Sequence, residues 1–95
     1  MRFRSRGTAD LYHGIESPRA RRLIPPGLRA IAVRKLQLLD QAQTLDDLAT
    51  IAGNQFELLR GDRAGQHSIR INRRFRICFI WTALGAIDVE IVDYH

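Results

Sequence analysis

The sequence predicts an α+β fold in which N-terminal helices pack on one face of a curved, mainly antiparallel, four- to five-stranded sheet. In the first half of the chain, apolar residues recur at helical spacing. In the second half they alternate with polar residues in short runs separated by turn-forming residues. Helices followed by a series of short strands are typical of the α+β class.

The N-terminal segment predicts two short elements and a loop. Residues 2–5 are expected to form an edge strand with Phe3 facing inward. Thr8 is expected to cap a short helix that Gly14 ends. Pro18 and the pair Pro25-Pro26 then predict an arginine-rich loop.

Two further helices follow this loop. Pro26 suits the first turn of a helix, and the strongest helical periodicity of the chain follows it, carried by Leu28, Ile31, Ala32, Leu36 and Leu39. Thr44 predicts the cap of a short helix with Asp46 and Asp47 in its first turn, where carboxylates favour the helix dipole. Gly53-Asn54 is expected to end that helix.

Residues 56–59, 68–71, 75–81 and 87–91 predict the strands, with turns at Asn72-Arg73 and Ala83-Leu84-Gly85. Alternation predicts which side chains face the helices: Ile69, Ile71, Phe75, Ile77, Phe79, Trp81, Ile87, Val89 and Ile91. It predicts that the opposite, open face carries Arg70, Arg74, Arg76, Asp88, Glu90 and Tyr94.

Size and composition exclude several classes of protein. Residues 1–95 are expected to form a single domain, with 45% apolar and 26% charged residues. The longest apolar run, residues 77–81, is too short to span a membrane, and the N-terminus leads into no signal peptide. One cysteine, Cys78, excludes an intrachain disulfide and a Cys-based zinc site. We expect a cytoplasmic protein without metal, cofactor or membrane partner.

Charge is distributed in blocks along the chain, whose net charge is +5. Residues 1–35 and 60–76 are strongly basic, whereas residues 36–59 and 77–95 are acidic. Fourteen of the fifteen basic residues are arginine, whose planar fork matches phosphate and carboxylate groups. If the two basic blocks converge in space, they form a surface suited to RNA.

The last three residues, Asp93, Tyr94 and His95, are candidates for chemistry. Cleavage of RNA through its own 2′-hydroxyl needs a base, an acid, and cations that hold the extra charge on phosphorus. Asp93 and His95 can transfer protons, and Tyr94 can stack on a base. The alternative interpretation is a frayed, polar chain end without a role.

Arginines of the second half are candidates for binding phosphate. Arg60 and Arg76 are the expected catalytic cations. The loop residue Arg63 and the open-face residues Arg70 and Arg74 are expected to bind RNA. Two alternatives stay open: Asp62 pairs with Arg63 or another surface arginine, and Arg76 is an edge cation paired with Glu90 or Asp88.

Three segments together resemble the HigB-type toxins of bacterial type II toxin–antitoxin systems, within the RelE/ParE superfamily. They are Leu-Arg-Gly-Asp-Arg-Ala-Gly at 59–65, Phe-Arg-Ile at 75–77 and Asp-Tyr-His at 93–95. The combination is far more specific than any one motif. The resemblance is close in the C-terminal half, and it extends to the helical half in length and layout.

This resemblance implies a RelE-like microbial RNase-type fold and metal-independent, ribosome-dependent cleavage of messenger RNA. It implies the 70S ribosome and a helix-turn-helix antitoxin of the HigA type as partners, with operator DNA bound only through the antitoxin complex. The family's functional residues correspond to Arg60, Arg76, Asp93, Tyr94 and His95.

The sequence departs from the family pattern at two positions. Arg60 stands where relatives often have lysine, and arginine is the poorer proton donor, so Arg60 is expected to stabilise charge. Glu57 stands at a position assigned to a family histidine, so His95 or Asp93 would have to supply that proton transfer.

Two other functions remain open at this stage. One is a ParE-like toxin that inhibits DNA gyrase without cleaving nucleic acid, and the other is a non-catalytic, arginine-rich module that binds RNA or the ribosome. The terminal Asp-Tyr-His favours the nuclease, because a pure binder needs no cluster of titratable groups.

Overall fold

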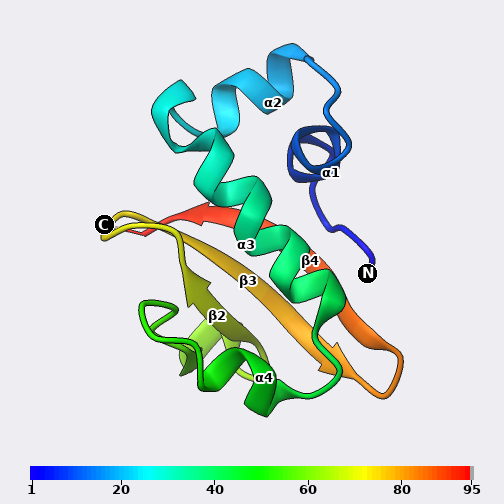
Figure 1. The fold of residues 1–95 in the computed structure, drawn as a ribbon, viewed down its shortest axis with the longest axis vertical. Coiled ribbons are helices and arrows are strands. Elements are labelled where there is room, and N and C mark those ends of the chain that lie inside the picture. The colour runs from blue at the N-terminus through cyan, green and yellow to red at the C-terminus, as the bar shows by residue number, and fades with distance from the viewer. Residues whose placement is uncertain (95) are drawn as a thin grey trace.

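The computed structural model describes residues 1–94, which form helices followed by a four-stranded antiparallel sheet (Figure 1). This confirms the predicted α+β fold. The helices are α1 (Arg6–Tyr12), α2 (Pro18–Leu23), α3 (Arg29–Gln41) and α4 (Leu45–Ala49), with short 3₁₀ turns η1 (Pro26–Leu28) and η2 (Gly61–Arg63). The strands are β1 (Glu57–Leu58), β2 (His67–Arg70), β3 (Phe75–Thr82) and β4 (Gly85–Asp93), adjacent in chain order.

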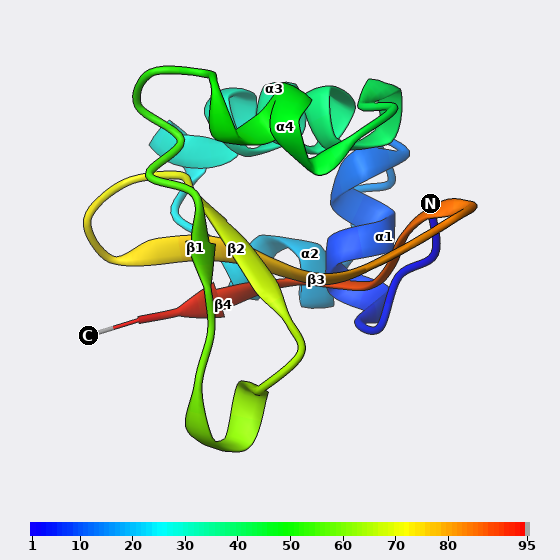
Figure 2. The same cartoon turned by 90° about the horizontal axis from the view of Figure 1, so that it is seen from below.

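Helices α3 and α4 lie over one face of the sheet (Figure 2), and α3 runs in nearly the same direction as β3 (Figure 1). The β1–β2 hairpin extends away from the layer that contains α3 and α4 (Figure 2). Leu36 and Leu39 of α3 and Leu48 of α4 are fully buried against Ile69, Ile77 and Phe79 of the sheet. No helix of the described residues has the length and apolar character that crossing a bilayer requires.

The N-terminal helices differ from the predictions in two respects. The cap of α1 is Ser5, whose Oγ accepts a hydrogen bond from the Thr8 amide at 3.1 Å. Thr8 is instead fully buried, and its Oγ1 accepts a hydrogen bond from the Ile91 amide of β4 at 3.1 Å. The loop predicted around Pro18 is wrong: Ser17 caps α2 and Pro18 takes its first position, where a missing N–H is tolerated.

The helices predicted after Pro26 and after Thr44 are confirmed. Thr44 and Asp47 form a capping box, since the Thr44 side chain accepts from the Asp47 amide and the Asp47 carboxylate accepts from the Thr44 amide. Hydrogen bonds from the Gln43 and Thr44 amides hold the pKa of Asp47 below its ordinary value.

A bulge in β4 overturns one predicted orientation. Cys78 pairs with Glu90 but Ile80 pairs with Ile87, so β4 contains one extra residue in this interval. Asp88, at a φ of 51°, absorbs it. Ile87 therefore shares the face of Ile80 and Cys78, away from the helices, and Ala86 takes the core position. The other predicted inward-facing residues lie in the core or pack against it.

The N-terminal residues protect the β4 edge of the sheet. Phe3 forms a parallel bridge with Val89, and its side chain packs against the core, as predicted. Backbone hydrogen bonds join Arg2 to Ala86 and both Arg2 and Arg4 to Val89. This pairing leaves β1 as the opposite edge of the described sheet.

Candidate nucleic-acid interface

The face of the sheet that points away from the helices carries a cluster of charged side chains, which we call the arginine face. Its members are Glu57, Arg63, Arg70, Arg76 and Glu90. The register pairs Arg70 with Arg76, Ser68 with Cys78, and Cys78 with Glu90, so these side chains share one face. Glu57 of β1 stands opposite Ser68.

Arg76 occupies the centre of this cluster in a fixed orientation. Its Nε donates a hydrogen bond to Ser68 Oγ at 2.7 Å, and its Nη2 donates to the backbone carbonyl of Gln55. The same Nη2 lies 3.4 Å from Glu57 Oε1. The expectation of a side chain projecting freely from an open face is wrong: Arg76 is only 7% exposed, because β1 and β2 surround it with polar partners. The alternative partners, Glu90 and Asp88, are also wrong.

A buried polar network outside the arginine face positions the Gln55 carbonyl. Asn54 is fully buried; its Oδ1 accepts from Lys35 Nζ, and its Nδ2 donates to the Leu48 carbonyl at 3.1 Å. Gln55 follows at a φ of 42°, in the left-handed region. This turn directs the Gln55 carbonyl at Arg76 and so connects α3 and α4 to the centre of the arginine face.

Arg63 joins the loop between β1 and β2 to β4. Its Nη1 donates to Glu90 Oε1 at 2.8 Å and to Gln66 Oε1 at 3.0 Å. The hydrogen bond to Glu90 is the main reason that the pKa of Arg63 is raised. Its partner is therefore Glu90 rather than the neighbouring Asp62. Arg4 lies 3.9 Å from the same Glu90, so one arginine from each basic block lies near this carboxylate.

Arg60 and Arg70 flank this cluster. Arg60 is exposed at the start of the β1–β2 loop, where it precedes η2. Arg70 ends β2 directly opposite Arg76 and is partly exposed. Within residues 1–94, neither side chain forms an ion pair, so both remain available to an anionic ligand.

The side chains of Asp93 and Tyr94, at the end of β4, lie on opposite faces of the sheet. Asp93 pairs with Phe75 in the sheet, one position beyond the pair of Arg76 and Val92, so alternation places it on the face opposite to Arg76. Its two carboxylate oxygens accept from Arg74 Nε and Nη2 at 2.8 and 2.7 Å, and this raises the pKa of Arg74.

Alternation returns Tyr94 to the arginine face, and its phenol is one of the smaller contributors that raise the pKa of Arg63. The structure thus brings Arg63, Arg70, Arg76 and Tyr94 together, and it places Arg74 and Asp93 apart from them. The predicted site residue His95 lies outside the described residues.

Glu57 is the residue of this site that sequence reasoning set aside. Its side chain is 57% exposed and lies beside the Arg76 side chain, which is 9% exposed. The signal was its position in an alternating run directly before the basic loop. An exposed carboxylate beside a fixed cation can accept a proton from a group that the cation holds in place.

Two further titratable side chains of the sheet, Cys78 and His67, are buried and partly buried. Cys78 is fully buried in the middle of the arginine face, and burial raises the pKa of its thiol. His67 lies between the rings of Phe56 and Phe79, at centroid distances of 5.1 and 6.0 Å. Among residues 1–94 no cluster of His, Cys, Asp and Glu is arranged to hold a metal ion.

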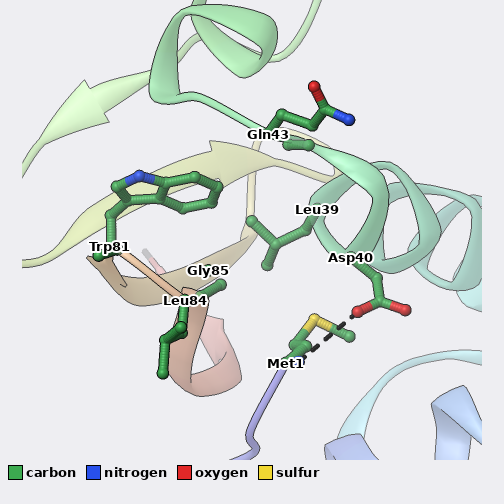
Figure 3. Close-up of a pocket in the computed structure, with 10 residues that line it drawn as sticks. Met1, Leu39, Asp40, Gln43, Trp81, Leu84 and Gly85 are labelled. Atoms are coloured by element: carbon green, nitrogen blue, oxygen red, sulfur yellow. Dashed lines mark ion pairs between the residues drawn. The ribbon is translucent and has the colours of Figure 1, made fainter.

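A separate pocket lies near the β3–β4 turn, at the other end of the sheet (Figure 3). Trp81, Leu84 and Leu39 form its apolar walls, and the Met1 amino group lies 3.7 Å from Asp40 Oδ1. It shares no residue with the arginine face.

Comparison with known proteins assigns the chain to a family. A family model described as a RelE-like toxin of type II toxin–antitoxin system HigB matches residues 2–95. Toxin HigB-1 of Vibrio cholerae serotype O1 is 37% identical over 95 residues, which cover 100% of this chain and 96% of that toxin. The chain therefore belongs to the HigB-like family of RelE-type toxins from type II toxin–antitoxin systems.

Proposed function

We propose that this toxin is a ribosome-dependent endoribonuclease that cleaves messenger RNA through the RNA 2′-hydroxyl. The observation that carries the proposal is the Arg76 guanidinium, held by Ser68, the Gln55 carbonyl and Glu57 on the face that the helices leave uncovered. A cation fixed before substrate arrives stabilises developing charge without reorganising at the moment of reaction.

The proposed reaction needs one proton acceptor and one proton donor. Glu57 accepts the proton of the 2′-hydroxyl, the 2′ oxygen attacks phosphorus, and the bond from phosphorus to the 5′ oxygen breaks. Arg76 stabilises the extra negative charge on the phosphoryl oxygens. His95, assigned from the family resemblance, returns a proton to the leaving 5′ oxygen. The products carry a 2′,3′-cyclic phosphate and a 5′-hydroxyl.

The other candidate residues have supporting roles in this proposal. Arg60, Arg63 and Arg70 bind backbone phosphates, and Tyr94 stacks on a base next to the cleaved bond. Asp93 holds Arg74 in a bidentate pair, which supports a role in fixing the end of β4. Membership of a type II toxin–antitoxin family supports a HigA-type protein as the neutralising partner, with operator DNA bound through that complex.

The test uses translating 70S ribosomes and a defined messenger, with new 5′ ends mapped after toxin is added. We expect cleavage by the native protein and a loss of about 100-fold or more in the single-turnover rate of Glu57→Gln, the usual range for a removed general base. Glu16→Gln, which removes an exposed carboxylate from the loop before α2, is the matched control.

Two outcomes would contradict the proposed function. An intact messenger together with defective DNA supercoiling would identify a gyrase inhibitor, and an intact messenger with stable ribosome binding alone would identify a non-catalytic module. Equal cleavage by Glu57→Gln and the native protein would remove only the assignment of the proton acceptor.

A further inference from the structure

A second group of arginines surrounds a cavity at the end of the sheet where β4 terminates. The cavity lies between the second half of α2, the segment that follows it, and the start of β3, with a volume of about 340 Å³. Arg21, Arg22, Arg74 and Asp93 supply its charged groups, and we call it the α2 cavity.

The charges of the α2 cavity are unbalanced. Arg74 is already paired with both oxygens of Asp93. Arg21 and Arg22 are exposed, and in the described part of the chain neither forms an ion pair with an acidic group. The cavity therefore presents two uncompensated guanidinium groups, each able to donate paired hydrogen bonds to a phosphate.

The α2 cavity and the arginine face lie at the same end of the β3–β4 pair. Asp93 of the cavity is paired with Phe75, and the adjacent pair is Val92 with Arg76. Successive residues along a strand are about 3.3 Å apart, so the two sites are neighbours across the sheet edge. Figure 1 shows the end of β4 next to the turn between β2 and β3.

We propose that the α2 cavity binds backbone phosphates of RNA as a second contact, separate from the site of cleavage. The proposal rests on the proposed function, which brings the protein to messenger and ribosomal RNA. At the arginine face, Glu57 and Glu90 already occupy the central guanidinium groups. At the α2 cavity, Arg21 and Arg22 have no such competitor and can bind phosphate directly. Because such binding releases counterions from the RNA, its affinity depends strongly on salt.

The experiment compares two double variants with the same change in net charge. Arg21→Gln with Arg22→Gln removes the free cations of the α2 cavity. Arg2→Gln with Arg34→Gln removes two exposed arginines elsewhere and is the control. Affinity is measured against salt for a fluorescent single-stranded RNA and for vacant 70S ribosomes, and cleavage is followed separately on translating ribosomes.

For the cavity variant we expect the slope of log affinity against log salt to be smaller in magnitude by about 1.4. Each of the two lost phosphate contacts with single-stranded RNA accounts for about 0.7 of this decrease. The control should retain the native slope. Loss on the free RNA assigns the site to messenger, and loss on ribosomes alone assigns it to ribosomal RNA. Equal behaviour of the two double variants overturns the proposal. A native protein that binds RNA through the cavity but cleaves no messenger refutes only the proposed function.

Discussion

The two faces of the sheet are both well packed, but they are held together by different interactions. On the helix side, Ile69, Ile77 and Phe79 are fully buried against apolar side chains of α3 and α4. On the other side, Ser68, Cys78 and Arg76 are almost equally inaccessible, yet Arg76 donates hydrogen bonds to Ser68 and to the Gln55 carbonyl. The difference indicates that one face supplies stability and the other supplies a fixed polar geometry. Three substitutions test this division.

The largest expected effect on stability comes from the helix-side face. Ile77→Ala removes a fully buried side chain whose neighbours cannot all move into the space. We expect the free energy of unfolding to fall by about 2–5 kcal/mol, measured by urea denaturation. RNA affinity of the fraction that remains folded should stay unchanged. A decrease in the free energy of unfolding below about 1 kcal/mol would contradict the idea that the helix-side face supplies most of the stability.

Arg76→Lys should affect activity more than stability. Lysine keeps the positive charge but cannot donate at once to Ser68, to the Gln55 carbonyl and to a phosphate from a planar fork. We expect messenger cleavage to fall about 100-fold, in line with the loss of one preorganised charge-stabilising group. The loss of stability should be about 1–3 kcal/mol, from acceptors left unpaired. Arg34→Lys, on the exposed surface of α3, is the control. Cleavage by Arg76→Lys at the native rate would show that Arg76 has no role in stabilising the charge of the reaction.

The smallest effect concerns pH and His67. Burial lowers the pKa of His67, and its Nδ1 has no hydrogen-bond partner among the described residues. The unfolded chain therefore binds the proton more readily, starting from its ordinary pKa of about 6.5. Stability should be complete above that pH and should decline as pH falls below it. In thermal melts between pH 8 and pH 5, His67→Phe should reduce this decline. An unaltered slope in His67→Phe would contradict the assignment.

Local patterns in the sequence predicted the elements with strong signals. The periodic apolar residues of α3, the Thr44 cap and the alternation of β2 and β3 each depend on neighbouring residues, and the structure confirms them. Pro18 misled the prediction, because a proline that interrupts one segment also begins a helix well. The β4 bulge escaped the prediction, since strict alternation has no means of detecting one extra residue.

The candidate site was less predictable, because its geometry depends on residues distant in sequence. The motifs drew attention to Arg63, Arg76 and the chain end, but not to the partners that fix them. Arg76 meets Gln55, twenty-one positions earlier, and Arg63 meets Glu90, twenty-seven positions later. Asn54 resembled a helix stop in the sequence, whereas its buried amide connects α3 to the turn that holds Arg76. Such roles follow from tertiary packing, which spacing alone does not encode.

The bulge at Asp88 has a consequence for reading the evolution of this family. A residue at a φ of 51° is selected for its tolerance of a left-handed backbone, which favours Asp, Asn and Gly. A preference for aspartate at such a position would arise without any demand for its charge. We therefore expect homologues to exchange these three residue types at position 88 freely, while they retain the one-residue offset that lets Ala86 and Val89 point to the same side of β4.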